Sequence, residues 1–183
     1  MISVEVENLK QVQKALKDQP QKVNLVLSRA INRAATNAKS NMSKKVREEY
    51  LVKASDVKDT INISKATSSN PSAMVKSKGQ RIDLVDFKLT PKVLFKGQNN
   101  YSVQVHKSGG LKKVPGFAAA SNKWGLFMRT GVAQYPIKRL MGPSVPQMIG
   151  HESVITWIEQ EAGLMLNKRV EVELKQVLGA KRS

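Results

Sequence analysis

Three lysines flank a glycine-rich turn in the stretch HKSGGLKKV, which spans residues 106–114. The small residues at 108–110 permit a tight turn, so the stretch predicts a hairpin tip that carries Lys107, Lys112 and Lys113. A lysine is a mobile point charge rather than a rigid fork, which suits contact with phosphates of any base sequence. We therefore predict that these three lysines contact the phosphate backbone of DNA.

Residues that could catalyse a reaction or hold a metal are few. The chain has no cysteine and two histidines, His106 and His151. His106 falls on the polar face of an alternating run, and His151 precedes the start of a helix, where capping explains it. Metal-dependent nucleases need clustered carboxylates, whereas Asp83 and Asp86 stand alone in their region. We therefore predict no enzymatic activity, no metal site and no cofactor.

The net charge of +17 is concentrated in two segments without acidic residues. Residues 19–47 carry seven basic side chains and residues 87–151 carry ten, while the rest of the chain is balanced. A solvated surface normally mixes both signs of charge, so this segregation predicts a polyanionic partner. Nucleic acid is the favoured partner, and an acidic protein or general solubility is the alternative. Two tryptophans, three tyrosines and four phenylalanines supply few stacking platforms, which favours duplex over single-stranded DNA.

Length and composition are those of one globular domain. Of the 183 residues, 40% are hydrophobic and 25% are charged, which allows a core and argues against disorder. The N-terminal stretch MISVEVENLK lacks the basic-then-apolar order of a signal peptide. No apolar run has the length of a membrane span. We therefore expect a soluble protein without membrane contact.

Two long helices are predicted near the two ends of the chain. Over residues 20–50, apolar residues recur at spacings of three and four, and basic residues fall on the opposite face. Arg29 and Arg33 lie on that basic face and are the competing candidates for phosphate contact. A helical period returns in residues 151–178. Its apolar side is expected to hold Val154, Trp157, Ile158, Leu164, Met165 and Leu174.

Shorter elements complete a predicted α+β fold. One short helix is expected over residues 6–17, and another after Tyr50, capped by Ser55. From residue 62 to 129 the period becomes two, with a slip in RIDLVDFKL that indicates a bulge or bend. The strands follow one another without intervening helices, which favours a mostly antiparallel sheet packed with the long helices. The single domain, residues 1–183, thus divides into a helical part (1–60), a β-rich part (61–131), a connection (132–150) and a C-terminal helix (151–178).

The connection contains YPIKRLMGPSVPQMIG, residues 135–150, with three prolines, two glycines and no acidic residue. Proline restricts φ, so such a segment loses little entropy on docking. We predict a pre-shaped contact between subunits or between rings, and the alternative is a linker packed on its own domain. The candidate contact residues are Pro136, Lys138, Arg139, Leu140, Met141, Pro143, Pro146 and Met148.

The chain resembles the minor tail protein Z family, the tail completion proteins of lambda-like long-tailed bacteriophages. The resemblance runs from about residue 24 to the C-terminal helix and includes LSRAINRAATNAKSNMSKKVREEY, VKASDV, RIDLVDF, VPGFAAA, GLFMRTG and YPIKRLMGPSVPQMI. Its most specific part is the order PGF, FMR, YPI and SVP.

The resemblance implies a non-enzymatic virion protein that acts late in tail assembly, in the host cytoplasm. It would complete the head-proximal end of the tail so that the tail joins a filled head. It would do so as a ring, commonly sixfold, in contact with neighbouring tail and head–tail connector proteins. The charge layout agrees, because a ring around sliding duplex DNA needs a basic lumen without base readout. A stand-alone sequence-nonspecific DNA-binding protein and a pure adaptor for acidic partners remain as alternatives.

Overall fold

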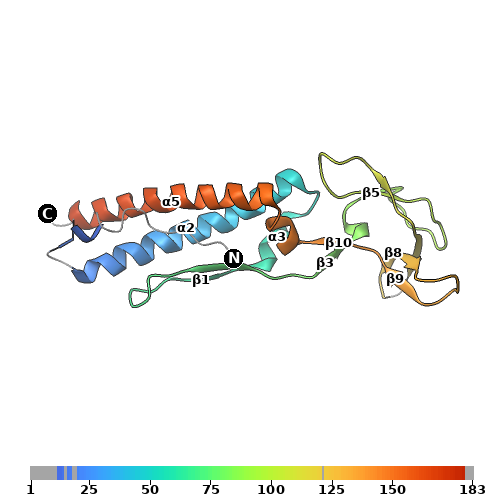
Figure 1. Cartoon of the computed structure of the whole chain (residues 1–183), viewed down its shortest axis with the longest axis horizontal. Coiled ribbons are helices and arrows are strands. Elements are labelled where there is room, and N and C mark those ends of the chain that lie inside the picture. The colour runs from blue at the N-terminus through green and yellow to red at the C-terminus, as the bar shows by residue number, and fades with distance from the viewer. Residues whose placement is uncertain (1–11, 15, 18–19, 121, 180–183) are drawn as a thin grey trace.

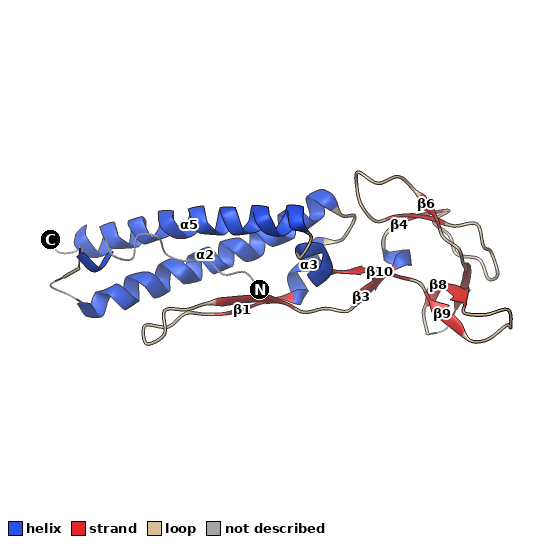
Figure 2. Cartoon of the chain, in the orientation of Figure 1, coloured by secondary structure: helices blue, strands red, loops and turns tan. Residues whose placement is uncertain are grey.

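The computed structural model of the chain describes residues 12–14, 16–17, 20–120 and 122–179. The molecule is elongated, with two long helices side by side at one end and small β-sheets at the other (Figure 1). Colouring by secondary structure shows that the long helices and most of the strands occupy different halves of the molecule (Figure 2). The predicted α+β class is confirmed.

The two long helices are α2, Pro20–Glu49, and α5, Glu152–Gly179. Each matches its predicted bounds to within one residue. Their facing sides are buried in one apolar cluster, in which Ala30 and Ala34 of α2 lie with Leu166 and Val170 of α5. Alanine side chains are short, so the two helix backbones can approach closely. Of the short helix predicted over residues 6–17, only 12–14 and 16–17 lie among the described residues.

The prediction for the apolar side of α5 is wrong at Leu164, whose side chain is 68% exposed. Ile158, Ala162 and Leu166 are buried at spacings of four and define the inner stripe of the helix. Leu164 lies two residues from that stripe, which turns its side chain by about 200° around the helix axis. It therefore faces away from α2.

A short helix and a hairpin run along α2. Helix α3, Ala54–Thr60, starts one residue before Ser55, so the Ser55 hydroxyl donates to Asp56 Oδ1 at 2.9 Å instead of capping the helix. Strands β1, Ile61–Ser64, and β2, Met74–Ser77, pair antiparallel. Lys39 of α2 donates from Nζ to the Ile61 carbonyl at 2.7 Å. One cation of the acid-free segment 19–47 thus donates a hydrogen bond to the backbone of the same chain.

At the other end, the described strands form further small sheets, and every pairing is antiparallel as predicted. The predicted slip in RIDLVDFKL is a 3-10 turn, η1, Leu84–Asp86. The sheets comprise β3, Arg81–Asp83, with β10, Met141–Ser144; β4, Lys88–Thr90, with β5, Ser102–Gln104, and β6, Lys112–Lys113; and β7, Phe117–Ala120, with β8, Trp124–Arg129, and β9, Ile137–Arg139.

The main core lies where the C-terminal end of α2 meets these sheets. Val46 and Tyr50 from the end of α2 share one buried cluster with Tyr101, Leu126 and Ile158. The fully buried Tyr101 accepts the Phe95 N–H through its hydroxyl at 2.9 Å, which ties down the loop after β4. The helical end and the β-rich end therefore share one hydrophobic core.

The segment predicted as a pre-shaped connection is built into this core. It forms β9, β10 and helix α4, Val145–Ile149. Ser144 caps α4: its hydroxyl accepts the Gln147 N–H at 3.4 Å, while the Gln147 Oε1 accepts the Ser144 N–H at 2.9 Å. Pro146 lies in the first turn, where a missing N–H costs no helix hydrogen bond. Proline here shapes a helix start and packs within the domain.

Candidate partner-binding surface of the β-rich end

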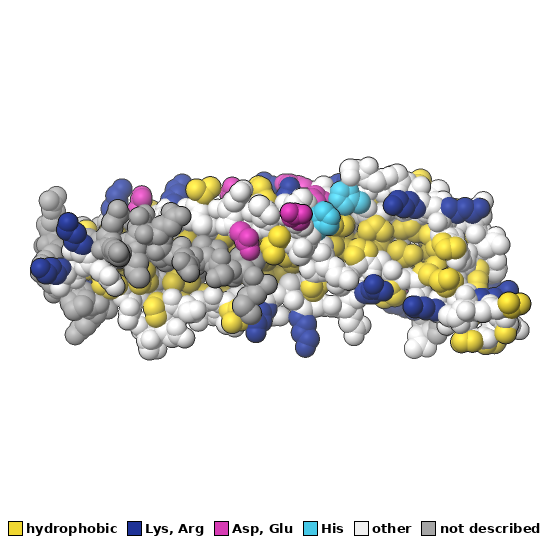
Figure 3. Space-filling view, viewed as in Figure 1, with side chains coloured by type: hydrophobic (Ala, Val, Ile, Leu, Met, Phe, Trp, Pro, Cys, Tyr) yellow, Lys and Arg dark blue, Asp and Glu magenta, His cyan; other side chains and the backbone are white. Residues whose placement is uncertain are grey.

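Side chains of the acid-free segment 87–151 cover the β-rich end with exposed positive charge. Nine of its ten cations are exposed: Lys88, Lys92, Lys96, Lys107, Lys112, Lys113, Lys123, Arg129 and Lys138. The space-filling view shows hydrophobic side chains gathered on this half of the molecule, with Lys and Arg around them (Figure 3). The surface therefore combines apolar contact area with an excess of positive charge.

The predicted hairpin forms, since β5 pairs antiparallel with β6, and its loop is hydrogen-bonded to the end of α2. Leu51 donates its N–H to the Val105 carbonyl at 2.9 Å, and Lys107 donates its N–H to the Glu49 carbonyl at 2.7 Å. Among the described residues, positive φ occurs at Gly97, so Gly109 and Gly110 form the loop without a left-handed backbone conformation. Backbone hydrogen bonds of Glu49 and Leu51 therefore hold the loop between β5 and β6 beside the end of α2.

The three lysines of this hairpin are exposed and lie on different parts of it. Lys107 lies in the loop beside α2, whereas Lys112 and Lys113 form β6 in the sheet with β4 and β5. Successive residues of a strand point to opposite faces. Lys112 and Lys113 therefore present their charges differently, although they are neighbours in sequence.

An apolar groove of about 410 Å³ runs beside β6. Lys112 and Lys113 are the cations at its edge. Its apolar lining includes Leu84, Val103, Val105, Val114, Leu140 and Pro143. The same end of the molecule exposes further large apolar side chains, among them Val93, Phe95, Leu111, Trp124, Val132 and Tyr135. The apolar groove and these exposed side chains together make this end of the molecule a candidate surface for contact with other proteins.

Two of the predicted contact residues, Arg139 and Met148, take part in internal packing. Met148 has an exposed fraction of 0% and lies in the main core, so it is not available to another subunit in this fold. Arg139 forms an ion pair with Asp83 at 2.5 Å and donates to the Trp124 carbonyl at 2.9 Å. Arg139 thus links β9 to β3 and to β8.

The remaining predicted contact residues divide by exposure. Leu140 is half-buried, and its N–H donates to the Leu126 carbonyl of β8 at 2.8 Å. Pro143 and Pro146 are also half-buried. Pro136, Lys138 and Met141 are exposed and remain candidates for contact with a partner.

The two candidate arginines of α2, Arg29 and Arg33, also differ in whether they contact another part of the chain. Arg33 Nε lies 3.2 Å from Glu173 Oε1 of α5, and the Glu173 side chain is 1% exposed. This contact is an ion pair, although it lacks hydrogen-bond geometry. Arg33 therefore neutralises a buried carboxylate within the chain, whereas Arg29 is exposed on α2 and remains a candidate for phosphate contact.

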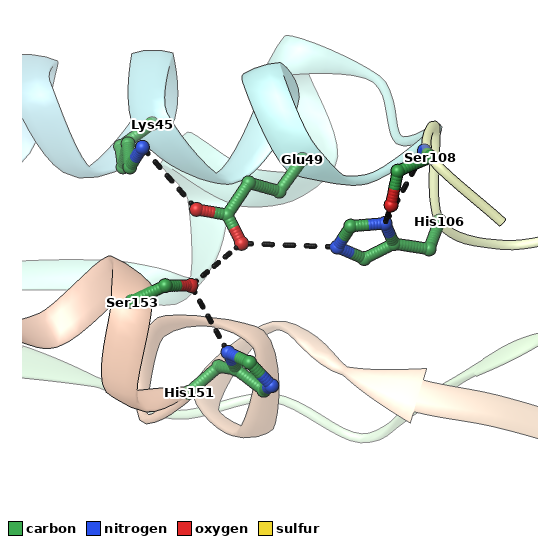
Figure 4. A network of polar contacts seen from close by, with 6 residues as sticks. All are labelled: Lys45, Glu49, His106, Ser108, His151 and Ser153. Atoms are coloured by element: carbon green, nitrogen blue, oxygen red, sulfur yellow. Dashed lines mark hydrogen bonds and ion pairs between the residues drawn. The ribbon is translucent and has the colours of Figure 1, made fainter.

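A polar network joins the end of α2, the β5–β6 loop and the start of α5 (Figure 4). Glu49 is its centre: Lys45 Nζ lies 3.2 Å from Oε1, and the Ser153 hydroxyl donates to Oε2 at 2.8 Å. His106 Nε2 lies 3.7 Å from the same Oε2, and His151 Nδ1 lies 3.1 Å from the Ser153 hydroxyl. Both histidines of the chain thus belong to a joint between elements that are distant in sequence.

The order Ser108, His106 and Glu49 also resembles a nucleophilic triad, but the distances indicate a structural role. The Ser108 hydroxyl lies 2.7 Å from His106 Nδ1, and the Ser108 N–H donates to this nitrogen at 3.3 Å, which closes the loop locally. The 3.7 Å from His106 Nε2 to Glu49 is longer than a hydrogen bond. Glu49 is held by Lys45 and Ser153. Among the described residues, no three His, Cys, Asp or Glu side chains gather as a metal would require.

The pKa of Glu49 is lowered from its ordinary value of 4.5. Burial alone would raise this pKa, but hydrogen bonds from Ser153 and Lys45 and the charges of Lys45 and His106 together outweigh burial. A carboxylate whose pKa is lowered by folding stabilises the fold above its unfolded pKa. That contribution is lost as the pH falls through the lower, folded pKa.

We expect the free energy of unfolding of the wild type to fall between about pH 5 and about pH 3 more steeply than that of Glu49→Gln. Glutamine cannot titrate, so the stability difference between the two proteins should shrink as the pH falls. Urea unfolding followed by circular dichroism at several pH values measures this difference. Glu48→Gln, which removes the same charge at an exposed neighbour, is the control. An equal change in the control would contradict a special role for the network.

The fold and this surface define an elongated α+β protein whose β-rich end carries apolar and cationic contact area. None of the helices in the described part of the chain combines the length and apolar character needed to cross a bilayer. No family model, curated protein or solved structure matches the chain.

Proposed function

We propose that this chain is a non-enzymatic structural protein of a phage tail, which completes the head-proximal end and takes part in joining the tail to the head. It acts as a ring of identical subunits, with duplex DNA in a basic lumen. The resemblance of its sequence stretches to tail completion proteins supports this function. The virion tail or neck is the proposed location.

One observation carries the proposal: exposed apolar and exposed cationic side chains share the end of the molecule built from the acid-free segment. Phe95 and Tyr135 there are 59% and 68% exposed. Such groups are buried when subunits assemble, because burial of apolar surface drives most protein association. The cations match a polyanion that passes the assembled subunits.

A stand-alone DNA-binding protein would need the positive charge but not the exposed apolar side chains. A pure adaptor would need the apolar side chains and an acidic protein neighbour. The exposed apolar residues Val93, Leu111 and Val132 therefore favour an assembly component over a free DNA-binding module.

The proposal is tested by deleting the coding sequence from a phage or prophage that carries it. Tails are then expected to reach full length but not to join filled heads, and the wild-type chain supplied in trans should restore joining. Electron microscopy of the particles measures this, and labelled chain should be found at the head-proximal end of the tail. Normal numbers of joined, infectious particles without the chain would refute the proposed function.

A further inference from the structure

An open hollow of about 900 Å³ at the β-rich end is lined by two cations and two amides. We call it the anion pocket and define it by Asn99, Asn100, Lys113 and Arg129, all of which are exposed. These residues come from the loop before β5, from β6 and from the end of β8. The pocket lies wholly within the acid-free segment, so no carboxylate of its own lining competes for the cations.

Arg129 is held in an orientation that suits an anion. Its Cζ lies over the Phe117 ring, 5.8 Å from the ring centroid. A guanidinium resting on an aromatic face keeps its N–H edges free, and its planar fork matches two oxygens of a phosphate. Packing on Phe117 also lowers the number of rotamers that binding must restrict.

The turn between β6 and β7 brings Lys113 to the same hollow. A Cβ added to Gly116 would lie 2.4 Å from the Phe127 carbonyl oxygen, so only glycine permits this close approach to β8. Gly116 also donates its N–H to the Val114 carbonyl at 2.9 Å. The tight turn places the cation of β6 and the cation of β8 at one opening.

We infer that the anion pocket binds the phosphate backbone of duplex DNA without reading its bases. An arginine fork, a lysine point charge and two amide side chains can all donate hydrogen bonds to phosphate oxygens. The hollow is open and far larger than one phosphate, which fits a polymer that lies across it. This inference rests on the proposed function, in which DNA passes the subunits, and it names the residues that meet the DNA.

The test measures binding of the full chain to a duplex of about 30 base pairs by fluorescence anisotropy over a range of salt concentrations. We expect Arg129→Gln and Lys113→Gln each to weaken binding by about tenfold and to reduce the salt slope by about one. Lys88→Gln is the matched control, because it removes the same charge from an exposed residue of segment 87–151 that does not line the pocket. Its expected effect is less than about threefold, from long-range electrostatics alone. Circular dichroism confirms that each variant is folded.

Equal losses in all three variants would overturn the inference, because general charge and not the pocket would then explain binding. The inference would also be overturned if the wild type did not bind the duplex but bound polyglutamate, with that binding weakened by Arg129→Gln and Lys113→Gln and not by the control. The pocket would then be assigned to an acidic protein partner. In both cases the head–tail joining assay would still test the proposed function independently. Conversely, pocket-dependent DNA binding with normal joining in the deletion phage would support the pocket and refute the proposed function.

Discussion

Met148→Ala is expected to lower the free energy of unfolding by about 2–5 kcal/mol, the range measured when a large core side chain is truncated. Met148 has an exposed fraction of 0% and lies in the main core with Val145 and Ile149 of α4. Truncation leaves a cavity where α4 packs between the ends of the long helices and the sheets. Urea denaturation of the purified chain measures the change.

Met141→Ala is the matched control, because the same substitution is made seven positions earlier in the same segment, at a side chain that is 38% exposed. We expect it to change the free energy of unfolding by less than about 1 kcal/mol. If Met148→Ala were as mild as Met141→Ala, the buried position of α4 would be contradicted. The segment would then act as the exposed docking connection that the sequence alone suggested.

Arg33→Gln is expected to destabilise the chain by about 1–3 kcal/mol. The substitution removes the cation that lies 3.2 Å from the buried Glu173 carboxylate and leaves that charge without its partner. Breaking a fully buried pair costs about 3–5 kcal/mol. The expected loss is smaller here because the Arg33 side chain is 52% exposed, and water screens the pair.

Arg29→Gln serves as the control for Arg33→Gln, since it removes the same charge one turn earlier from an exposed face of α2. Its effect on thermal and urea unfolding should stay within about 0.5 kcal/mol. Adding Glu173→Gln to Arg33→Gln should recover part of the loss, because the buried group is then neutral. No recovery in the double variant would show that the arginine contributes by packing and not by charge.

Comparing the Arg29 and Arg33 variants also distinguishes an effect on stability from an effect on DNA binding. If Arg33 acts within the chain, Arg33→Gln should weaken DNA binding no more than Arg29→Gln does. The first basic segment would then hold cations with different roles: Lys39 bonds the Ile61 carbonyl, Arg33 neutralises Glu173, and Arg29 faces solvent. A charge count along the sequence cannot distinguish these roles, because all three residues lie on one helix.

Helices and strands were predictable from the sequence where they depend on the spacing of apolar residues within one short segment. The stripe from Val23 to Val46 specifies one face of α2, because positions three and four apart meet on a helix. The slip in RIDLVDFKL likewise predicted the interruption that η1 makes between β3 and β4. One local signal was missed: Ser144 and Gln147 have the spacing of a capping box and could have predicted the start of α4.

The sequence by itself thus determined the class of the fold, the long helices and the segments that carry positive charge. Only the tertiary structure decided which cations bond the chain itself and which face outward. In the folded chain, Met148 is buried and the 105–111 loop is hydrogen-bonded to the end of α2. Asn99 and Arg129 line the same pocket as Lys113. The physical reason is that periodicity and charge follow from neighbouring residues, whereas burial and pairing depend on which distant segments pack together in the core.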